Sequence, residues 1–153
     1  MNNKTAKDIM TQDVIVAKKD DSLSNIAKLL IKEKIGGLPV VDNDNKVVGI
    51  ISETDIMKKE TYVEAPHIIN FMQGLIYLDD YKKLEEEMKR VSAYKVGDLM
   101  SKDIVKVFED DGFDDIANLM IKKSVNRVPV VDENNTLKGI ICRYDIIRAM
   151  YNE

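Results

Sequence analysis

The pattern of apolar and polar residues predicts one set of short strands and helices that occurs twice along the chain. In the first copy the predicted order is β-α-β-β-α: a strand at 14–16, a helix from Leu23, strands at 38–41 and 46–51, and a helix from Ser52. Polar residues at 20–22 can cap the first helix. Gly36 and Gly37 are expected to end it, because glycine adopts left-handed conformations without a steric penalty. The turn DNDN between the two later strands contains residue types that tolerate positive φ.

The second copy follows 90 positions later and aligns Lys7–Met57 with Gly97–Ile147 without a gap. About 20 of some 50 positions are identical, including an aspartate at Asp8 and Asp98 and another at Asp55 and Asp145. This is an internal duplication. It divides the chain into repeat 1 at 5–60, a helical connector at 61–94 and repeat 2 at 95–153. One such unit alone buries little surface, so two repeats are expected to pack as a pseudo-twofold pair with two equivalent clefts.

Composition and charge exclude several classes of protein. The chain has 153 residues, 44% of them apolar, and a formal net charge of −4, which does not suit a nucleic-acid binder. The single cysteine cannot form an internal disulfide. No signal peptide or membrane-spanning run is evident, so we expect a cytoplasmic protein without membrane contact.

The segments IGGLPVVDNDNKVVGIISETDI and VNRVPVVDENNTLKGIICRYDI, led by DIMTQDVIV and DLMSKDIVKV, resemble the cystathionine β-synthase (CBS) domain family. The resemblance covers both repeats and implies an α/β fold, a tandem CBS-domain pair or Bateman module. It also implies a homodimer associated through helices. Members of this family range from nucleotide sensors to dimerisation modules without a ligand.

In nucleotide-binding members, a G-x-x-S/T-x-x-D segment supplies an aspartate for ribose and a hydroxyl for phosphate, and the other repeat contributes the adenine contacts. Carried over to this sequence, the resemblance implies a first cleft formed by Ser52, Asp55, Met100, Val105, Val125, Asn126 and Arg127. It implies a second cleft formed by Cys142, Asp145, Met10, Ile15, Ile35, Gly36 and Gly37, with Arg143 as a nearby source of positive charge.

The chemistry of these residue types suits such a ligand. A carboxylate can accept hydrogen bonds from both ribose hydroxyls, and the start of a helix favours an anion. Arg127 can face phosphate oxygens with its planar guanidinium group, although it can equally be a solvated surface residue. Cys142 is a weaker hydrogen-bonding group than Ser52, so the two clefts are not expected to be equivalent.

A second interpretation of Ser52-x-x-Asp55 is a capping box at the start of a helix. Two observations favour ligand binding over capping alone. Asp145 recurs where Cys142 is a poor cap. A glycine, Gly49 or Gly139, recurs just before each motif, where it could leave the backbone open to a ligand.

Other residues have structural interpretations. Pro39 and Pro129 are expected at a strand start or edge. Met10 and Met100 suit the core better than a ligand contact, and His67 cannot form a multi-histidine metal site alone. In the connector, DDYKKLEEEMKRV predicts an amphipathic helix. The preceding apolar segment HIINFMQGLIYL either covers its own module or contributes to a dimer interface or a gate.

The sequence therefore predicts a non-enzymatic sensor of an adenosine-containing ligand such as AMP, ADP or ATP. No resident cofactor is expected, and an unknown effector protein would read the ligand-bound state. The alternatives are a structural dimerisation or docking module without a ligand, or a sensor of S-adenosylmethionine or a cyclic dinucleotide.

Overall fold

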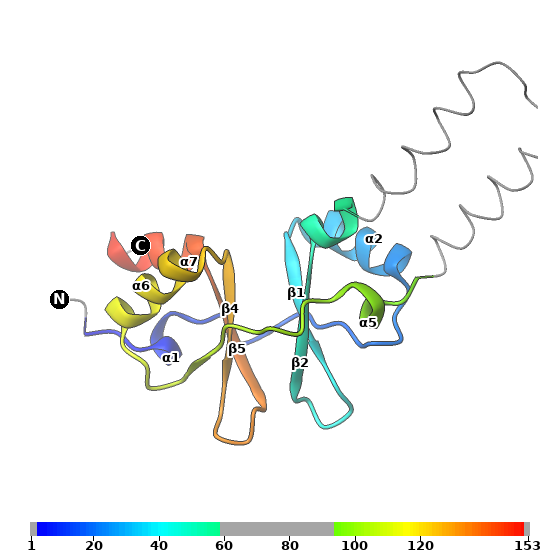
Figure 1. The fold of residues 1–153 in the computed structure, drawn as a ribbon. Coiled ribbons are helices and arrows are strands. Elements are labelled where there is room, and N and C mark those ends of the chain that lie inside the picture. The colour runs from blue at the N-terminus through cyan, green and yellow to red at the C-terminus, as the bar shows by residue number, and fades with distance from the viewer. Residues whose placement is uncertain (1–2, 59–93, 152–153) are drawn as a thin grey trace, which may run out of the picture. The chain divides into compact units, whose positions relative to one another are not determined.

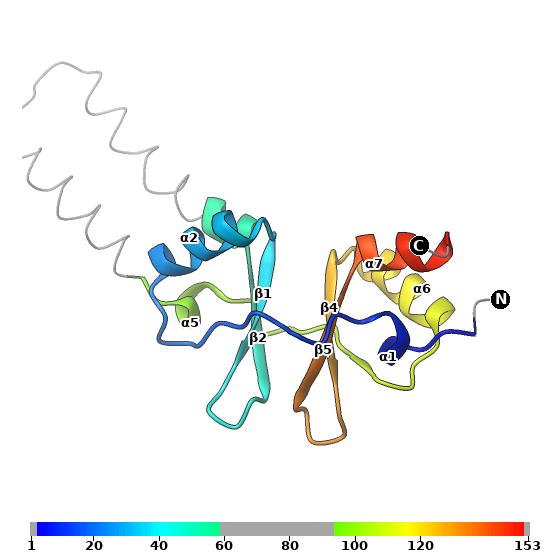
Figure 2. The ribbon, with the colours of Figure 1, turned by 180° about the vertical axis from the view of Figure 1, so that it is seen from behind.

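The computed structural model describes residues 3–58 and 94–151, which belong to two compact units (Figures 1 and 2). Unit 1 comprises Met1–Val16, Pro39–Gly49 and Ser101–Glu153, and unit 2 comprises Ala17–Leu38 and Ile50–Met100. The units are therefore not the sequence repeats, because the segment that leads into each repeat groups with the other repeat. The predicted boundaries at 5–60, 61–94 and 95–153 describe the repeats in the sequence and not the two structural units. The two predicted features of the connector, and His67, lie outside the described residues.

Unit 1 contains a three-stranded sheet with helices beside it (Figure 1). Its elements are α1 Ala6–Ile9, β3 Val107–Phe108, α6 Phe113–Lys123, β4 Arg127–Val131, β5 Leu137–Cys142 and α7 Arg143–Met150. Strand β4 is central, parallel to β3 and antiparallel to β5. Thr11 extends β5 on its other side, since the backbones of Thr11 and Ile140 exchange hydrogen bonds of 2.9 and 3.0 Å.

The core of unit 1 forms where α1, α6 and α7 meet strands β4 and β5. Its buried residues are Ala6, Ile9, Val107, Phe113, Ile116, Met120, Val128, Val130, Ile141 and Ala149. Helix α6 contributes Phe113, Ile116 and Met120 from one face, as the helical spacing of apolar residues predicts.

Unit 2 contains α2 Leu23–Glu33, α5 Val96–Leu99 and a helical segment at residues 53–58. Ser22 caps α2, since its hydroxyl accepts a 3.1 Å hydrogen bond from the Asn25 amide as predicted. The chain at 94–97 runs beside the start of α2, where the Leu23 amide donates to the Tyr94 carbonyl. Strands β1 Gly37–Val41 and β2 Val47–Ser52 form a separate two-stranded sheet with residues in both units.

Two local predictions were wrong. The segment 14–16 is not a strand. Val14 and Val16 instead pack against a buried apolar cluster that includes Val41 and Val131. In repeat 2 the segment equivalent to 14–16 is 104–106, and the first strand, β3, begins at the next residue, Val107.

The end of α2 was also misassigned. The left-handed residue is Lys34, with φ 53°, and Gly36 and Gly37 lie beyond it. The Ile35 amide donates to the Leu30 carbonyl at 3.1 Å, and Ser124 and Val125 end α6 in the same way. These bonds satisfy helix carbonyls and stabilise a left-handed residue without glycine.

Pro129 lies inside β4 rather than at its start, opposite Ile140 of β5. Strand β3 pairs only with Val130 and Val131, so at Pro129 the strand has a neighbour in β5 but not in β3. A missing N–H is tolerated there for the same reason as at an edge.

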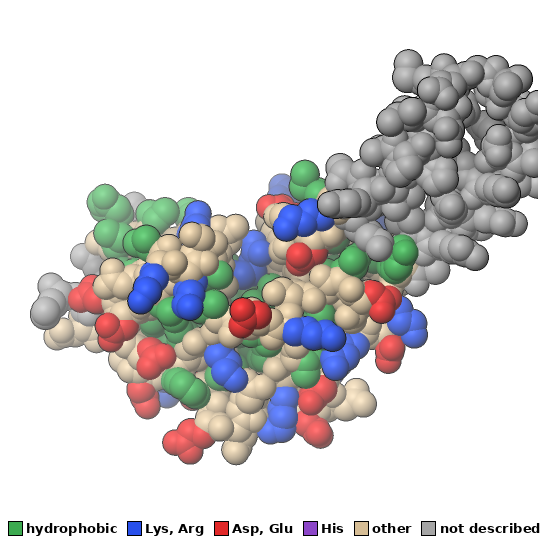
Figure 3. Space-filling view, in the orientation of Figure 1, with side chains coloured by type: hydrophobic (Ala, Val, Ile, Leu, Met, Phe, Trp, Pro, Cys, Tyr) green, Lys and Arg blue, Asp and Glu red, His purple; other side chains and the backbone are tan. Residues whose placement is uncertain are grey.

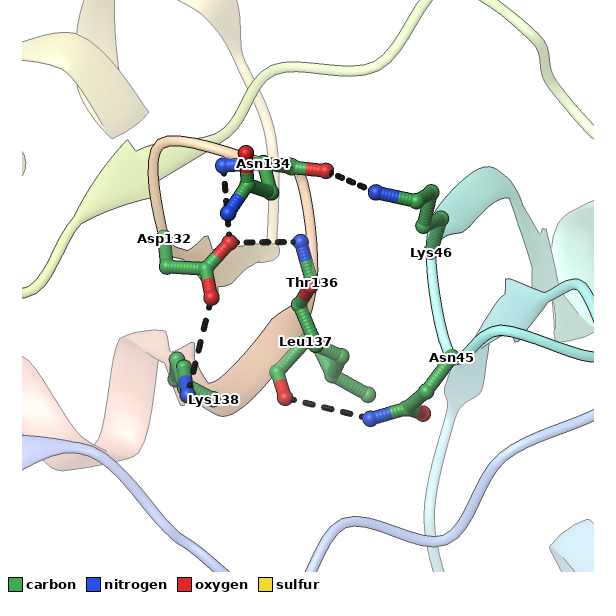
Figure 4. A network of polar contacts seen from close by, with 7 residues as sticks. All are labelled: Asn45, Lys46, Asp132, Asn134, Thr136, Leu137 and Lys138. Atoms are coloured by element: carbon green, nitrogen blue, oxygen red, sulfur yellow. Dashed lines mark hydrogen bonds and ion pairs between the residues drawn. The ribbon is translucent and has the colours of Figure 1, made fainter.

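The two hairpin turns of the chain are joined to each other within unit 1 (Figure 4). Asn45 and Asn135 have φ values of 61° and 65°, which confirms the expectation of positive φ in these turns. The Asn45 carbonyl accepts from the Leu137 amide at 3.0 Å, and its side-chain amide donates to the Leu137 carbonyl at 3.3 Å. Asn135 makes the same pair of bonds with Val47, at 3.1 and 2.9 Å. We call this symmetrical arrangement the asparagine clasp.

Candidate functional site

In unit 2, Ser52 and Asp55 form a reciprocal cap at the helical segment that begins at residue 53. Asp55 Oδ2 accepts from the Ser52 amide at 2.9 Å and from the Ser52 hydroxyl at 3.0 Å. The Asp55 amide donates back to Ser52 Oγ at 3.3 Å. Among the described residues, Asp55 Oδ1 accepts no hydrogen bond. One oxygen of this half-buried carboxylate is thus used in capping, and the other accepts no hydrogen bond from the described residues.

The Ser52 hydroxyl is already committed in this arrangement. Its single proton points to Asp55 Oδ2, so it can donate to a phosphate only by leaving that bond. The predicted role of Ser52 as a phosphate donor therefore involves an exchange of partners.

In unit 1, Asp145 occupies the equivalent position at the start of α7, with both oxygens engaged. Oδ2 accepts from the Cys142 amide at 2.7 Å, and Oδ1 accepts from Arg148 Nη2 at 3.0 Å. The residue is 8% exposed. The ion pair with Arg148 was not predicted from the sequence, although the i,i+3 spacing of the two residues on a helix indicates such a pair.

Asp145 acts as a cap although Cys142 replaces the serine, so the prediction that capping alone cannot explain this aspartate was wrong. A capping aspartate accepts from the backbone amide of the N-cap residue, and that bond does not require a serine hydroxyl. The same contact occurs at two helix starts without an assigned ligand role. Asp8 accepts from the Thr5 amide at 2.8 Å and hydroxyl at 2.9 Å, and Asp98 accepts from the Lys95 amide at 3.2 Å.

The segment before each L-P-V or V-P-V run lies next to the helix start of its own repeat. The Gly36 carbonyl accepts from the Glu53 amide at 2.9 Å, and the Asn126 carbonyl accepts from the Arg143 amide at 3.1 Å. Arg143 Nε also donates to the Val125 carbonyl at 3.3 Å. The family resemblance predicts that these segments belong to the cleft of the opposite repeat. That assignment joins residues of both units and stays a prediction.

Arg127 lies directly opposite Cys142 in the β4–β5 pairing. The thiol is half-buried, and burial raises its pKa, with the Asp145 carboxylate raising it further and Arg127 lowering it. Cys142 is therefore a protonated thiol at neutral pH rather than a reactive thiolate.

Met10 packs on Gly139 in unit 1. A methyl group built at Gly139 would overlap the Met10 side chain, including Cγ and Sδ. This contact, rather than an open path for a ligand, accounts for that glycine, so the earlier interpretation of Gly139 was wrong.

The remaining predicted contacts are apolar residues that are partly or fully buried. Met100 is buried, Ile15 and Ile35 are half-buried, and Val105 and Val125 pack against the core of unit 1. Gly37 is the first residue of β1 and is buried.

The described residues contain no group of three or more side chains that could hold a metal ion. Within the same ranges, 3–58 and 94–151, no helix has the length and apolar character needed to cross a membrane.

Comparisons with known proteins identify the family. The family model for the CBS domain matches residues 6–61 and 96–152. The uncharacterised protein MJ1426 of Methanocaldococcus jannaschii is 35% identical over 94% of this chain and 89% of its own length. Inosine-5'-monophosphate dehydrogenase of the same organism is 32% identical over 95% of this chain, which spans only 23% of that enzyme.

Two similar solved structures contain adenosine derivatives. CBSX2 of Arabidopsis thaliana in complex with AMP has a TM-score of 0.75 and 28% identity, with 97% of each chain covered. The CBS domain pair of protein MJ0100 in complex with 5'-methylthioadenosine and S-adenosyl-L-methionine has a TM-score of 0.73 and 28% identity, covering 96% of this chain and 99% of that one. The repeat, the fold and these matches agree that this chain belongs to the CBS domain family and is a tandem CBS pair.

Proposed function

We propose that the chain is a non-enzymatic regulatory module that binds an adenosine-containing ligand such as AMP, ADP or ATP. The first ligand site is centred on Ser52 and Asp55, and the second on Cys142 and Asp145. Each uses residues of the other repeat as predicted above: Met100, Val105, Val125, Asn126 and Arg127 for the first, and Met10, Ile15, Ile35, Gly36 and Gly37 for the second.

The observation that carries the proposal is that the two oxygens of the Asp55 carboxylate differ in their hydrogen bonds. Oδ2 takes both hydrogen bonds from Ser52, and Oδ1 accepts none from the described residues. A cis-diol such as the 2'- and 3'-hydroxyls of ribose presents two donors that an ionised carboxylate can accept together. The capping bonds hold the carboxylate in place before a ligand arrives, which limits the entropy lost on binding.

The solved relatives support an adenosine derivative but differ in what is attached to the ribose. One is bound to AMP, and the other to 5'-methylthioadenosine and S-adenosyl-L-methionine. Arg143 is the first residue of α7 and provides positive charge at the second site, and Arg127 belongs to the residues proposed for the first site. A guanidinium group at each site favours a phosphate-bearing ligand over an uncharged nucleoside.

Regulation would require a second molecule to respond to the ligand. We propose a homodimer, because the two repeats expose large apolar side chains at equivalent positions. Ile31 and Ile121 are 78% and 76% exposed, and Met57 and Ile147 also project from their helices. In Figure 3, apolar side chains gather on unit 1 over α7, which also exposes Tyr144 and Met150. An effector protein would then bind one ligand state of the dimer more tightly than the other.

The test is thermal unfolding of the purified chain with AMP, ADP, ATP, S-adenosylmethionine or cyclic di-AMP. At about 100 times its dissociation constant a ligand adds about 2.7 kcal/mol to stability, which raises the Tm by about 5–10 °C for a chain of this size. Asp55→Ala should remove most of this rise. Asp8→Ala is the matched control, because it removes an equivalent capping contact outside both predicted ligand sets.

The outcomes separate the alternatives. A rise with AMP, ADP or ATP that survives Asp8→Ala and falls in Asp55→Ala supports the proposal. A rise confined to S-adenosylmethionine or cyclic di-AMP changes the ligand class but retains the site. If no compound raises the Tm, the docking module without a ligand is the better account.

A further inference from the structure

We infer that Arg148 restrains the second ligand site by occupying the carboxylate that would bind ribose, an inference that rests on the function proposed above. In α7, Arg148 Nη2 lies 3.0 Å from Asp145 Oδ1, and the Cys142 amide lies 2.7 Å from Oδ2. Both oxygens of Asp145 therefore already accept a hydrogen bond from the protein. At Asp55 the protein takes only Oδ2 among the described residues.

Because Asp145 is buried, the hydrogen bond from Arg148 to its carboxylate limits access by a ligand. Asp145 is 8% exposed, so an incoming diol meets little of the carboxylate while Arg148 remains on it. The Arg148 side chain is 47% exposed, and its guanidinium group can move into solvent without opening the core. The ion pair is thus a contact that a ligand can displace.

Displacement has a cost that the first site does not carry. To accept both ribose hydroxyls through Oδ1, which has two acceptor positions, Asp145 must give up its charge-assisted hydrogen bond from Arg148, whereas Asp55 Oδ1 accepts no hydrogen bond from the described residues that would have to be given up. We therefore expect the second site to bind the same ligand more weakly than the first. The cysteine at position 142 adds to this difference, because a thiol is a poorer hydrogen-bonding partner than the Ser52 hydroxyl.

Arg148 also differs from the capping contacts of Asp145 in what it does for the fold. The hydrogen bond from the Cys142 amide to Asp145 satisfies a backbone N–H group at the start of α7. The Arg148 contact is a partly exposed i,i+3 ion pair, a class that adds little to stability. Its removal should therefore leave the protein folded, so that the change in ligand affinity at this site can be measured.

The test uses calorimetric titration with AMP in an Asp55→Ala background, so that the second site dominates the signal. The variants are Asp55→Ala alone and with Arg148→Met, which keeps an unbranched side chain without the charge. A third protein combines Asp55→Ala with Lys138→Met, the matched control, because Lys138 is a cation of similar exposure that makes an ion pair with Asp132 instead of Asp145. Far-ultraviolet circular dichroism checks that each variant is folded.

We expect Arg148→Met to tighten AMP binding about two- to fivefold, the range that corresponds to the free energy of a partly exposed ion pair, and Lys138→Met to leave it unchanged. Arg148→Lys, which installs the residue found at the equivalent Lys58, should fall between Met and the wild type. Equal or weaker binding by the Arg148→Met protein would overturn the restraint and assign Arg148 a positioning role, while the proposed function would stand if wild-type protein binds AMP. Absence of binding to wild-type protein by AMP, ATP and S-adenosylmethionine would overturn both.

Discussion

The asparagine clasp allows a quantitative test of what joins the two hairpins. Replacement of Asn135 by glycine removes the 2.9 Å hydrogen bond from its side-chain amide to the Val47 carbonyl but keeps a residue that accepts φ 65°. A neutral hydrogen bond contributes about 1 kcal/mol, and we expect Asn135→Gly to cost about that much. The ease of glycine in the left-handed region offsets its greater freedom in the unfolded chain.

Replacement of Asn135 by alanine adds a second cost. The left-handed conformation disfavours a Cβ-bearing side chain by about 1 kcal/mol, so Asn135→Ala should lose about 2 kcal/mol in total. The exposed contact between Lys106 Nζ and Asn135 Oδ1, at 2.7 Å, is not expected to change this value much, because solvent competes for it.

Asn45 provides the internal comparison. Its φ is 61°, but its side-chain bond to the Leu137 carbonyl is longer, at 3.3 Å, and the residue is exposed. Asn45→Gly should therefore cost less than Asn135→Gly, while the extra loss from glycine to alanine should be similar at both positions.

Urea unfolding followed by circular dichroism measures all four free energies. If alanine costs no more than glycine at either position, the left-handed conformation does not disfavour alanine and the second cost is absent. If Asn45→Gly costs more than Asn135→Gly, the ranking by bond length and burial is wrong.

Three further predictions concern other contacts. Gly139→Ala should destabilise the chain by about 1–3 kcal/mol in urea unfolding, because the added methyl group overlaps Met10. In a Met10→Ala background, Gly139→Ala should be nearly neutral, and additive losses would exclude the contact between the two residues. Cys142 should react with a thiol reagent more slowly than free cysteine at pH 8, with a rate that rises as pH approaches its raised pKa, and a fast reaction at pH 7 would contradict the burial argument. Ile147→Glu should shift the chain towards monomer in light scattering, and an unchanged mass would argue against a dimer through α7.

Much of the fold could be predicted because the duplication repeats its local signals. The spacing of Leu23, Ile26 and Leu30 and the cap at Ser22 identify α2, and the same pattern identifies α6. The asparagines in the two turns indicated positive φ, which the structure confirms. These features depend on residues close together in sequence.

The features that escaped prediction depend on contacts between distant residues. The strand expected at 14–16 is absent because Val14 and Val16 are drawn into an apolar cluster rather than into a sheet. The grouping of residues 1–16 with repeat 2 leaves no local pattern in the sequence. The asparagine clasp needs two turns that are about 90 residues apart to meet.

The aspartates shared by the two repeats have a common physical explanation that changes how the candidate site should be sought. Asp8, Asp98, Asp55 and Asp145 each accept from a backbone amide three residues earlier, so their recurrence is required by the helix starts alone. Identity between the repeats therefore cannot distinguish a ligand site from a cap.

Differences between the repeats carry more information, because the fold tolerates either residue at such a position. Ser52 is replaced by Cys142, Gly37 by Arg127 and Lys58 by Arg148. In unit 1, Cys142 is the N-cap of α7, Arg127 pairs with Cys142 across the sheet, and Arg148 reaches Asp145 from the last turn of α7. Capping and core packing do not require these changes, since Asp145 makes its backbone contact with a cysteine at the N-cap. They are the positions at which two copies of one site can acquire different affinities, and a titration that finds two equal sites would remove the reason to treat them as functional.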